Sequence, residues 1–316
     1  MTHQEAAAWL LDHDGYLILT HVRPDGDTLG CAAGLCAALR SRGKTAYVLP
    51  NPETTRTYLD YVEAYHAPED YEPETVISVD VAGLGLMPQA AAPYIGRIAL
   101  AIDHHPSQEF FAGETCLDAD RAACGELVYD ICVDMGAMSA EAARPLYVAV
   151  STDCGCFAYG NTRPDTHRVA AALMDWGDFY QEVNKRCFRT KSLKRLRLES
   201  MLVEGMESWE DGLVVMGAVT LEMLARVEAT EADAEDLAAL LGQVEGAKVA
   251  ATIRELAPGR CKLSLRTDPA VLDATRTCAL LGGGGHRAAA GATLELPLEE
   301  TKAAVRQAIR QVLAEG

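Results

Sequence analysis

The sequence lacks the long apolar runs that a membrane-spanning helix requires. No stretch of its 316 residues reaches the ~18 to 20 consecutive apolar positions that cross a bilayer. The first residues, MTHQEAAAWLLDHDG, carry Glu5 and no basic cluster, so they predict an amphipathic helix rather than a signal peptide. These absences predict a cytoplasmic protein that makes no use of a membrane.

The cysteines lack the spacings of zinc or redox motifs. None of the ten cysteines belongs to a CxxC pair. A chain of this length does not depend on a disulfide framework, so we expect reduced thiols packed as small apolar groups. Two common glycine motifs are also missing, because the GGGG run at 282–285 is not a Walker loop and no GxGxxG follows the first apolar run.

Positive charge is scarce. The chain has 28 Lys and Arg against 46 Asp and Glu, a formal net charge of -18. Long nucleic acid is held mainly by cations that neutralise its phosphates, so a broad duplex-binding surface is not expected. A small phosphorylated ligand needs only a local cationic cluster and is not excluded.

What the first half does contain is an alternation of short apolar runs with helical patterns. This alternation predicts an α/β domain with a mainly parallel sheet over residues 1–183. Helices are expected at Thr28–Arg42, Ala122–Met135 and Pro164–Trp176. Strands are expected at Tyr16–Thr20, Thr45–Leu49, Thr75–Asp80, Arg97–Asp103 and Leu146–Thr152.

The second half differs in pattern. A charged, glycine-poor segment predicts a helical linker over residues 184–208, and a smaller α/β domain is expected over 209–316. Within that domain, EADAEDLAALL (231–241) predicts a helix. The segment LGGGGHRAAAG (281–291) predicts a glycine loop followed by a helix and a strand.

Carboxylates and imidazoles follow the predicted strands of the first domain. In a parallel sheet the carboxyl ends of the strands share one edge, where ligands bind, so we expect these side chains to converge. A lone Asp at such a place is usually a helix cap, but the recurrence after four strands favours a common site. The residues are His21, Asp25 and Asp27, then Asp80, then Asp103, His104 and His105, then Asp153.

Five carboxylates cannot stay ionised together unless a cation is present, because like charges raise each other's pKa. The set is too large for one ion and suits two. Imidazole and carboxylate ligands without thiolates favour Mn, Fe(II) or Co. Two such ions can clamp a phosphoryl group and produce a hydroxide at neutral pH.

The second domain offers a candidate ligand surface. The glycines of LGGGGHRAAAG permit close approach of the backbone, and a helix starting near His286 would offer free N–H groups to a phosphate. In CKLSLRT the alternation places Lys262, Ser264 and Arg266 on one strand face. That face either lies in solvent or grips a substrate phosphate.

Taken in order, HVRPDGDTLG, SVD, AIDHH and STDCGCF resemble the four motifs of the DHH phosphoesterases. SLRT and LGGGGHRAAAG resemble the DHH-associated domain of the branch that contains nanoRNases and pAp phosphatases. The resemblance implies two Mn²⁺ ions, with Mg²⁺ or Co²⁺ as alternatives. It assigns His21, Asp25 and Asp80 to one ion, and Asp27, Asp80, His104 and Asp153 to the other. It further places His105 at the substrate phosphate or its leaving group, Asp103 behind the histidines, and the nucleotide at Arg266, Gly283, Gly284, Gly285 and His286.

The implied reaction is attack by an activated hydroxide on a phosphate of a short oligonucleotide, a linear dinucleotide such as pApA or pGpG, or pAp. The acidic charge and the chain length argue against a RecJ-like exonuclease, and the glycine loop argues against a pyrophosphatase. A nucleotide-sensing module with the same site stays open. So does the preferred substrate, because the run VAGLGLM, Cys31 and Cys154 depart from the usual motifs. The oligomeric state is open as well, and a homodimer is one state that the sequence allows.

Overall fold

The computed structural model describes residues 1–234 and 237–315. The chain forms two compact units, Met1–Thr190 and Lys191–Gly316. The boundary falls inside the segment 184–208, where a helical linker is predicted. In the part of the chain that the structure describes, no helix is long and apolar enough to cross a membrane.

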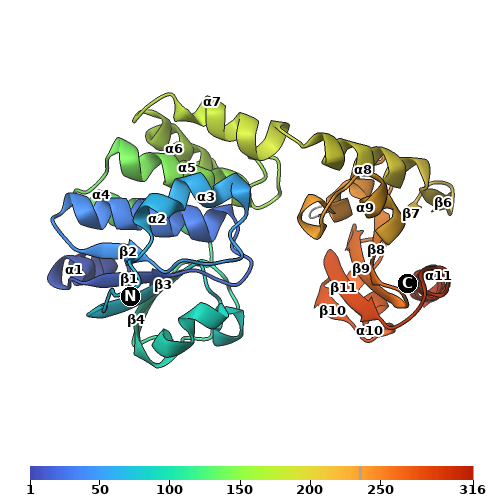
Figure 1. The fold of residues 1–316 in the computed structure, drawn as a ribbon, viewed down its shortest axis with the longest axis horizontal. Helices are drawn as coiled ribbons and strands as arrows, with labels where there is room; N and C mark the ends of the chain where they lie inside the picture. Colours follow the sequence, from blue (N-terminus) through green and yellow to red (C-terminus); the bar gives the residue numbers. More distant parts are fainter. Residues whose placement is uncertain (235–236, 316) are drawn as a thin grey trace. The chain divides into compact units, whose positions relative to one another are not determined.

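The first unit is built on a parallel sheet with the strand order β2-β1-β3-β4-β5 (Figure 1). All four neighbouring pairs run parallel, so the carboxyl ends of the strands lie at one edge. Four of these strands confirm predicted ones, and β5 was not predicted. The strands are β1 (Tyr16–Leu19), β2 (Ala46–Val48), β3 (Thr75–Val79), β4 (Ile98–Asp103) and β5 (Glu114–Leu117).

Both faces of this sheet are covered, which explains the continuous apolar runs of β1 and β3. On one face Ile18, Ile77 and Ile102 belong to the main core with the helices. On the other face Leu17 and Val76 pack with the 3₁₀ segment η3 (Gln89–Arg97). The helices are α1 (His3–Asp12), α2 (Gly26–Ser41), α3 (Arg56–Val62), α4 (Cys124–Asp134), α5 (Ala140–Asp153), α6 (Pro164–Met174) and α7 (Phe179–Asn184).

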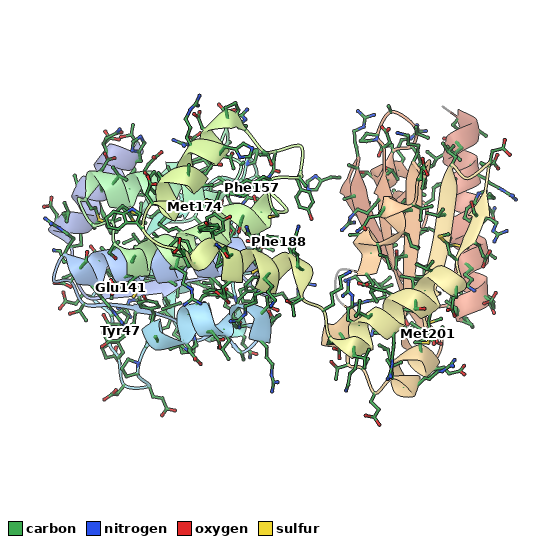
Figure 2. The ribbon with its side chains drawn as sticks, turned by 90° about the horizontal axis from the view of Figure 1, so that it is seen from above. Tyr47, Glu141, Phe157, Met174, Phe188 and Met201 are labelled. Atoms are coloured by element: carbon green, nitrogen blue, oxygen red, sulfur yellow. The ribbon has the colours of Figure 1, made fainter. Side chains whose placement is uncertain are left out.

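The predicted helices at 28–42, 122–135 and 164–176 correspond to α2, α4 and α6. The helical layer is closed by aromatic contacts. Phe157, labelled in Figure 2, has its ring 6.4 Å from that of Tyr147 and 5.1 Å from that of His167. A π-helical turn, Lys185–Arg189, follows α7 and ends the unit.

The strand predicted at Leu146–Thr152 is wrong, because these residues lie in α5. The helix begins after Ser139, whose side chain accepts a hydrogen bond from the N–H of Ala142. Residues 146–150 are all buried, so the helix is apolar on nearly every side and resembles a buried strand in sequence. It packs closely on α2, where a Cβ at Gly30 would lie 2.3 Å from the carbonyl oxygen of Pro145.

The second unit contains a mixed sheet with the order β10-β11-β9-β8-β7-β6 among the described residues. Helices α10 and α11 pack on one face, and α8, which carries Met201 (Figure 2), packs on the other. The smaller α/β domain is therefore confirmed. Its strands are β6 (Glu207–Trp209), β7 (Val214–Val219), β8 (Val249–Ala257), β9 (Arg260–Thr267), β10 (Gly284–His286) and β11 (Ala289–Leu294). Its helices are α8 (Leu193–Glu204), α9 (Leu221–Arg226), α10 (Ala274–Ala279) and α11 (Leu298–Glu315).

Two local predictions in this unit need correction. The helix expected near His286 is wrong, because Gly284–His286 pairs antiparallel with Ala289–Leu294 in a hairpin. Glycine allows the two segments of this hairpin to approach each other closely, since a Cβ at Gly283 would lie 2.1 Å from the carbonyl oxygen of Gly291. The helix predicted over 231–241 lies partly outside the described residues, and the described part forms short 3₁₀ turns.

Candidate metal centre

The loop between β1 and α2 supplies two candidate ligands. Asp25 is the N-cap of α2, and its Oδ1 accepts hydrogen bonds from two N–H groups of the first turn at 3.0 and 3.2 Å. The same oxygen lies 3.5 Å from Nε2 of His21. His21 donates its Nδ1–H to the carbonyl of Val22 at 2.8 Å, because a carbonyl can only accept. The lone pair on Nε2 therefore faces the carboxylates.

Asp27 is held by the start of α4. Its Oδ2 accepts a hydrogen bond from the N–H of Cys124 at 2.7 Å, and its Oδ1 accepts one from the N–H of Gly125 at 2.9 Å. The side chain is only 2% exposed. These two backbone donors fix the carboxylate without neutralising its charge.

Asp80 follows β3 in a left-handed conformation, with φ 58, which aspartate tolerates better than most residues. Its side chain is 3% exposed, and among the described residues nothing donates a hydrogen bond to its buried Oδ1. Nε2 of His104 and Nδ1 of His105 each lie 3.5 Å from that oxygen. Its Oδ2 lies 3.7 Å from Nε2 of His21. A buried oxygen without a donor is costly, and a cation held between the carboxylate and Nε2 of His104 would satisfy it.

Asp103 ends β4 and orients the two histidines that follow it. Its fully buried carboxylate accepts hydrogen bonds from the backbone N–H of His104 and from Nδ1–H of His105, both at 2.8 Å. The side-chain amide of Gln108 donates to its other oxygen at 2.7 Å. His104 donates its own Nδ1–H to the carbonyl of Arg121 at 3.2 Å, which leaves Nε2 able to bind a metal.

Asp153 reaches the site from the C-terminal end of α5, not from a strand. Its Oδ2 lies 3.9 Å from Nε2 of His104. The preceding Thr152 fills the space beside Gly26, where a Cβ would lie 2.3 Å from the threonine Oγ1. Glycine is therefore needed between the two aspartates of the first loop so that α5 can approach.

The six predicted metal ligands, together with His105, fall into three groups, and within each group the ligand atoms lie within 4.8 Å of one another. Asp80 belongs to two of these groups. The donors are imidazole nitrogens and carboxylate oxygens, which suits hard or borderline divalent cations. The groups are His21, Asp25 and Asp80; Asp27, His104 and Asp153; and Asp80, His104 and His105.

The pKa values in this cluster reflect crowded negative charge. Burial, followed by the charges of Asp153 and Asp25, raises the pKa of Asp27 well above its ordinary value. Burial and the charge of Asp27 do the same to the pKa of Asp80. Asp25 is the exception, since burial opposes its ionisation but the neighbouring His21 imidazole and the hydrogen bonds from the backbone lower its pKa. Positive charge supplied by bound cations would relieve the repulsion.

The second unit presents three of its predicted substrate residues, Arg266, Gly284 and His286, on one sheet face, whereas Gly285 pairs with Ala290 on the other. The register sets both Arg266 and His286 opposite Ala289, on the two strands that flank β11. Side chains directly opposite each other share a face. Ser264 and Gly284 form the next such row, opposite Gly291. Gly284, Gly285 and His286 are exposed, so this surface is open to a ligand.

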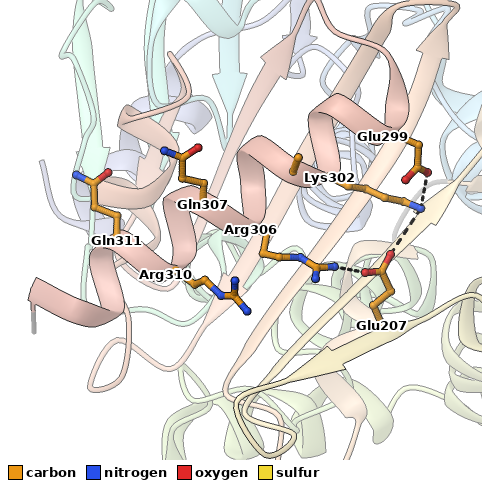
Figure 3. A pocket seen from close by; sticks show the side chains of 8 residues that line it. Glu207, Glu299, Lys302, Arg306, Gln307, Arg310 and Gln311 are labelled. Carbon is orange, nitrogen blue, oxygen red and sulfur yellow. Dashed lines mark hydrogen bonds and ion pairs between the residues drawn. The ribbon is translucent and has the colours of Figure 1, made fainter.

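A pocket of about 700 Å³ lies elsewhere in the second unit (Figure 3). It is lined by α11 and by Glu207 of β6, at the sheet edge opposite to β10. Its three cations are already paired with acids, since Lys302 and Arg306 contact Glu207 and Arg310 lies 3.9 Å from Glu210. This pocket is therefore a poor candidate for binding a phosphate.

Sequence reasoning missed the residues that support the ligands. Gln108 donates to Asp103 and to the carbonyl of Val81 at 2.9 Å. Asn161 donates its side-chain amide to the carbonyls of Ala122 and Asp153. No sequence signal marks Gln108 or Asn161, because the groups to which each donates a hydrogen bond are brought together only in the folded chain.

The fold and the site together define an α/β protein that carries adjoining acid and histidine groups at the carboxyl edge of a parallel sheet, followed by a second α/β unit. Residues 16–151 match the DHH family, N-terminal domain, and residues 217–315 match the DHHA1 domain. The chain belongs to the DHH family, as its motifs predict.

Relatives cover nearly the whole chain. It is 33% identical over 301 residues to the bifunctional oligoribonuclease and PAP phosphatase NrnA of Thermus thermophilus, covering 94% of this chain and 89% of the relative. The protein of the same name from Bacillus subtilis is 24% identical over 288 residues, covering 89% of this chain and 90% of the relative. The crystal structure of an exopolyphosphatase-related protein from Bacteroides fragilis has a TM-score of 0.87 at 23% identity, covering 98% of this chain and 96% of the other. That likeness extends the shared fold over both units.

Proposed function

We propose that this protein is a manganese-dependent phosphoesterase that hydrolyses short oligonucleotides, linear dinucleotides such as pApA and pGpG, and pAp. The observation that carries the proposal is the buried Oδ1 of Asp80, which lies between two imidazoles and has no hydrogen-bond donor among the described residues. The names of the relatives, which combine oligoribonuclease and PAP phosphatase, support the substrate class.

Two cations would be held by the chain's own ligands in the arrangement implied by the family motifs. His21, Asp25 and Asp80 would hold one, and Asp27, Asp80, His104 and Asp153 the other. When bound, such ions supply Lewis acidity and a hydroxide at neutral pH. The chain contributes the fixed directions of its ligands, because a backbone carbonyl or N–H anchors His21, Asp27 and His104.

His105 is proposed to act on the substrate. Its Nδ1–H is bound to Asp103, and that hydrogen bond is the main reason why the pKa of His105 is raised. The side chain is 42% exposed, unlike the 12% of His104. A protonated His105 can therefore donate from Nε2 to a phosphate oxygen or to the departing oxygen.

The second unit is proposed to bind the nucleotide. Arg266 offers a charged, forked donor, and the neighbouring small residues let a ligand approach the backbone. A local cation of this kind suits a small substrate, whereas a net charge of -18 opposes binding of long duplexes. All ten cysteines are free thiols, which fits the reducing cytoplasm.

A substrate panel tests the proposal. Purified protein is incubated with pAp, pApA, pGpG and a labelled 5-mer, with Mn²⁺ or with a chelator, and kcat/KM is measured for each. We expect hydrolysis with Mn²⁺ and none after chelation. Binding of these compounds without turnover, in Mn²⁺, Mg²⁺ or Co²⁺, would instead identify a nucleotide-sensing module.

A further inference from the structure

The segment Arg121–Gly125, which leads from β5 into the first residues of α4, contains none of the predicted metal ligands. It contacts Asp27 and His104 directly and is joined to Asp153, the third member of their group, through Asn161. We propose that this segment, here called the support loop, holds that group in place, and that Arg121 and Asn161 are positioning residues for it. The inference rests on the metal site of the proposed function.

The first contact is to His104. Its Nδ1–H is donated to the carbonyl of Arg121 at 3.2 Å, which fixes both the tautomer and the ring orientation. The second contact is to Asp27, whose two oxygens accept the N–H groups of Cys124 and Gly125. The two ends of the support loop therefore grip an imidazole and a carboxylate of the same group.

The third contact is made through Asn161. Its side-chain amide donates to the carbonyl of Ala122 at 3.0 Å and to the carbonyl of Asp153 at 3.1 Å. This bridge joins the middle of the support loop to the end of α5. Since Asp153 is the ligand brought by a helix rather than by a strand, the bridge sets its distance from the sheet edge.

The side chain of Arg121 fixes the support loop itself. Its guanidinium contacts Asp118 at 2.9 Å, Asp130 at 2.5 Å and Glu126 at 3.8 Å. Asp118 follows β5, whereas the other two acids lie on α4. Only 21% of the arginine side chain is exposed, so these contacts are better shielded from solvent than an ordinary surface pair. Arg121 thereby ties the strand end to the helix and sets the direction of its own carbonyl.

The plainer interpretation is that these ion pairs only stabilise the fold. The two interpretations differ in what Arg121→Gln and Asn161→Ala change. If these contacts only stabilise the fold, both substitutions lower Tm and leave the Mn²⁺ dissociation constants of the folded protein unchanged. A positioning role weakens metal binding at one of two sites, because loss of the partners that orient metal ligands typically lowers affinity about 10- to 100-fold.

The test is titration of full-length, metal-free protein with Mn²⁺, with free Mn²⁺ followed by electron paramagnetic resonance. We expect the wild type to bind two ions. In Arg121→Gln and Asn161→Ala the Mn²⁺ affinity should fall about 10- to 100-fold in one binding step only. Arg121→Lys should retain part of the affinity. Arg168→Gln is the matched control, since Arg168 also pairs with an acid, Asp165, but is 73% exposed. Added Mn²⁺ should restore the hydrolysis rate of both variants.

Asn161→Ala leaves every ion pair of Arg121 intact, so it answers the question even if Arg121→Gln fails to fold. The inference is overturned if folded Asn161→Ala binds Mn²⁺ with the wild-type dissociation constants, or if the affinity falls equally in both binding steps. It is also overturned if the wild type binds no Mn²⁺. Two bound ions without hydrolysis of any substrate would refute the proposed function and leave the support loop's role standing.

Discussion

Replacing Asp80 by Asn should change activity and metal-free stability in opposite directions. The substitution keeps the shape of a side chain that is 3% exposed and removes its charge. Asp80 belongs to two of the three candidate ligand groups, so the change would remove the ligand that we propose the two ions share. Metal ions contribute several kcal/mol of transition-state stabilisation, and a loss of about 4 kcal/mol corresponds to about a 1000-fold lower kcat.

Metal-free stability should rise instead. Burial and the charge of Asp27 raise the pKa of Asp80, so the ionised side chain opposes folding at neutral pH. Asn carries no charge, and the free energy of unfolding measured in a chelator should therefore increase. Thermal melts followed by circular dichroism measure this, and hydrolysis of pApA with saturating Mn²⁺ measures activity.

The matched control is Asp70→Asn, the same chemical change at an exposed position. It should leave both activity and stability unchanged. Turnover by Asp80→Asn within tenfold of wild type would show that Asp80 is not a shared metal ligand. A lower stability than wild type in the chelator would show that the Asp80 charge does not oppose folding.

Three other predictions follow from the site. His105→Ala should lower kcat by about 10²- to 10⁴-fold in a steady-state assay while the Mn²⁺ stoichiometry stays the same; an unchanged kcat would exclude a role in proton transfer. Burial raises the pKa of Asp27 and Asp80, so the metal-free fold binds more protons than the unfolded chain above about pH 4. Its free energy of unfolding should therefore fall as pH rises, and Mn²⁺ should raise Tm more at about pH 8 than at about pH 6 in scanning calorimetry; equal shifts would contradict the assignment. Arg266→Ala should raise KM for pApA by about 10- to 150-fold, from a loss of 1.5–3 kcal/mol, whereas Arg260→Ala, at an exposed position of the same strand, should not.

Much of the first unit could be predicted from its sequence, because its strands are short apolar runs that end in polar residues. His21, Asp80 and His104 follow parallel strands, and parallel strands bring their carboxyl ends to one edge. That rule alone was enough to place these three side chains together. For Asp25 the sequence allowed either a helix cap or a place in the common site. The two are compatible, since Asp25 caps α2 and also faces His21.

The strand prediction at Leu146–Thr152 failed because the spacing of apolar residues does not distinguish a helix from a strand where the segment is buried on nearly every side. Residues 146–152 are shielded by α2 and neighbouring elements, so no polar face distinguishes the helix from a strand. Asp153 was still placed in the site, for the wrong structural reason.

The glycine segment failed for another reason. Glycine permits both a loop at a helix start and close contact between strands, and the composition of 282–285 does not separate them. In the structure, Gly283 faces the backbone of Gly291, so pairing of β10 and β11 decides the conformation. Support from Asn161 and Arg121 was equally invisible, because it depends on contacts between distant segments.

Anomalous diffraction from crystals grown with Mn²⁺ would show whether Asp80 lies between two metal ions, as we propose. We expect two peaks about 3.5–4 Å apart, one on each side of the Asp80 carboxylate. One peak should lie beside Nε2 of His21 and the other beside Nε2 of His104. A single peak, or peaks that do not contact Asp80, would show that Asp80 does not bridge two ions.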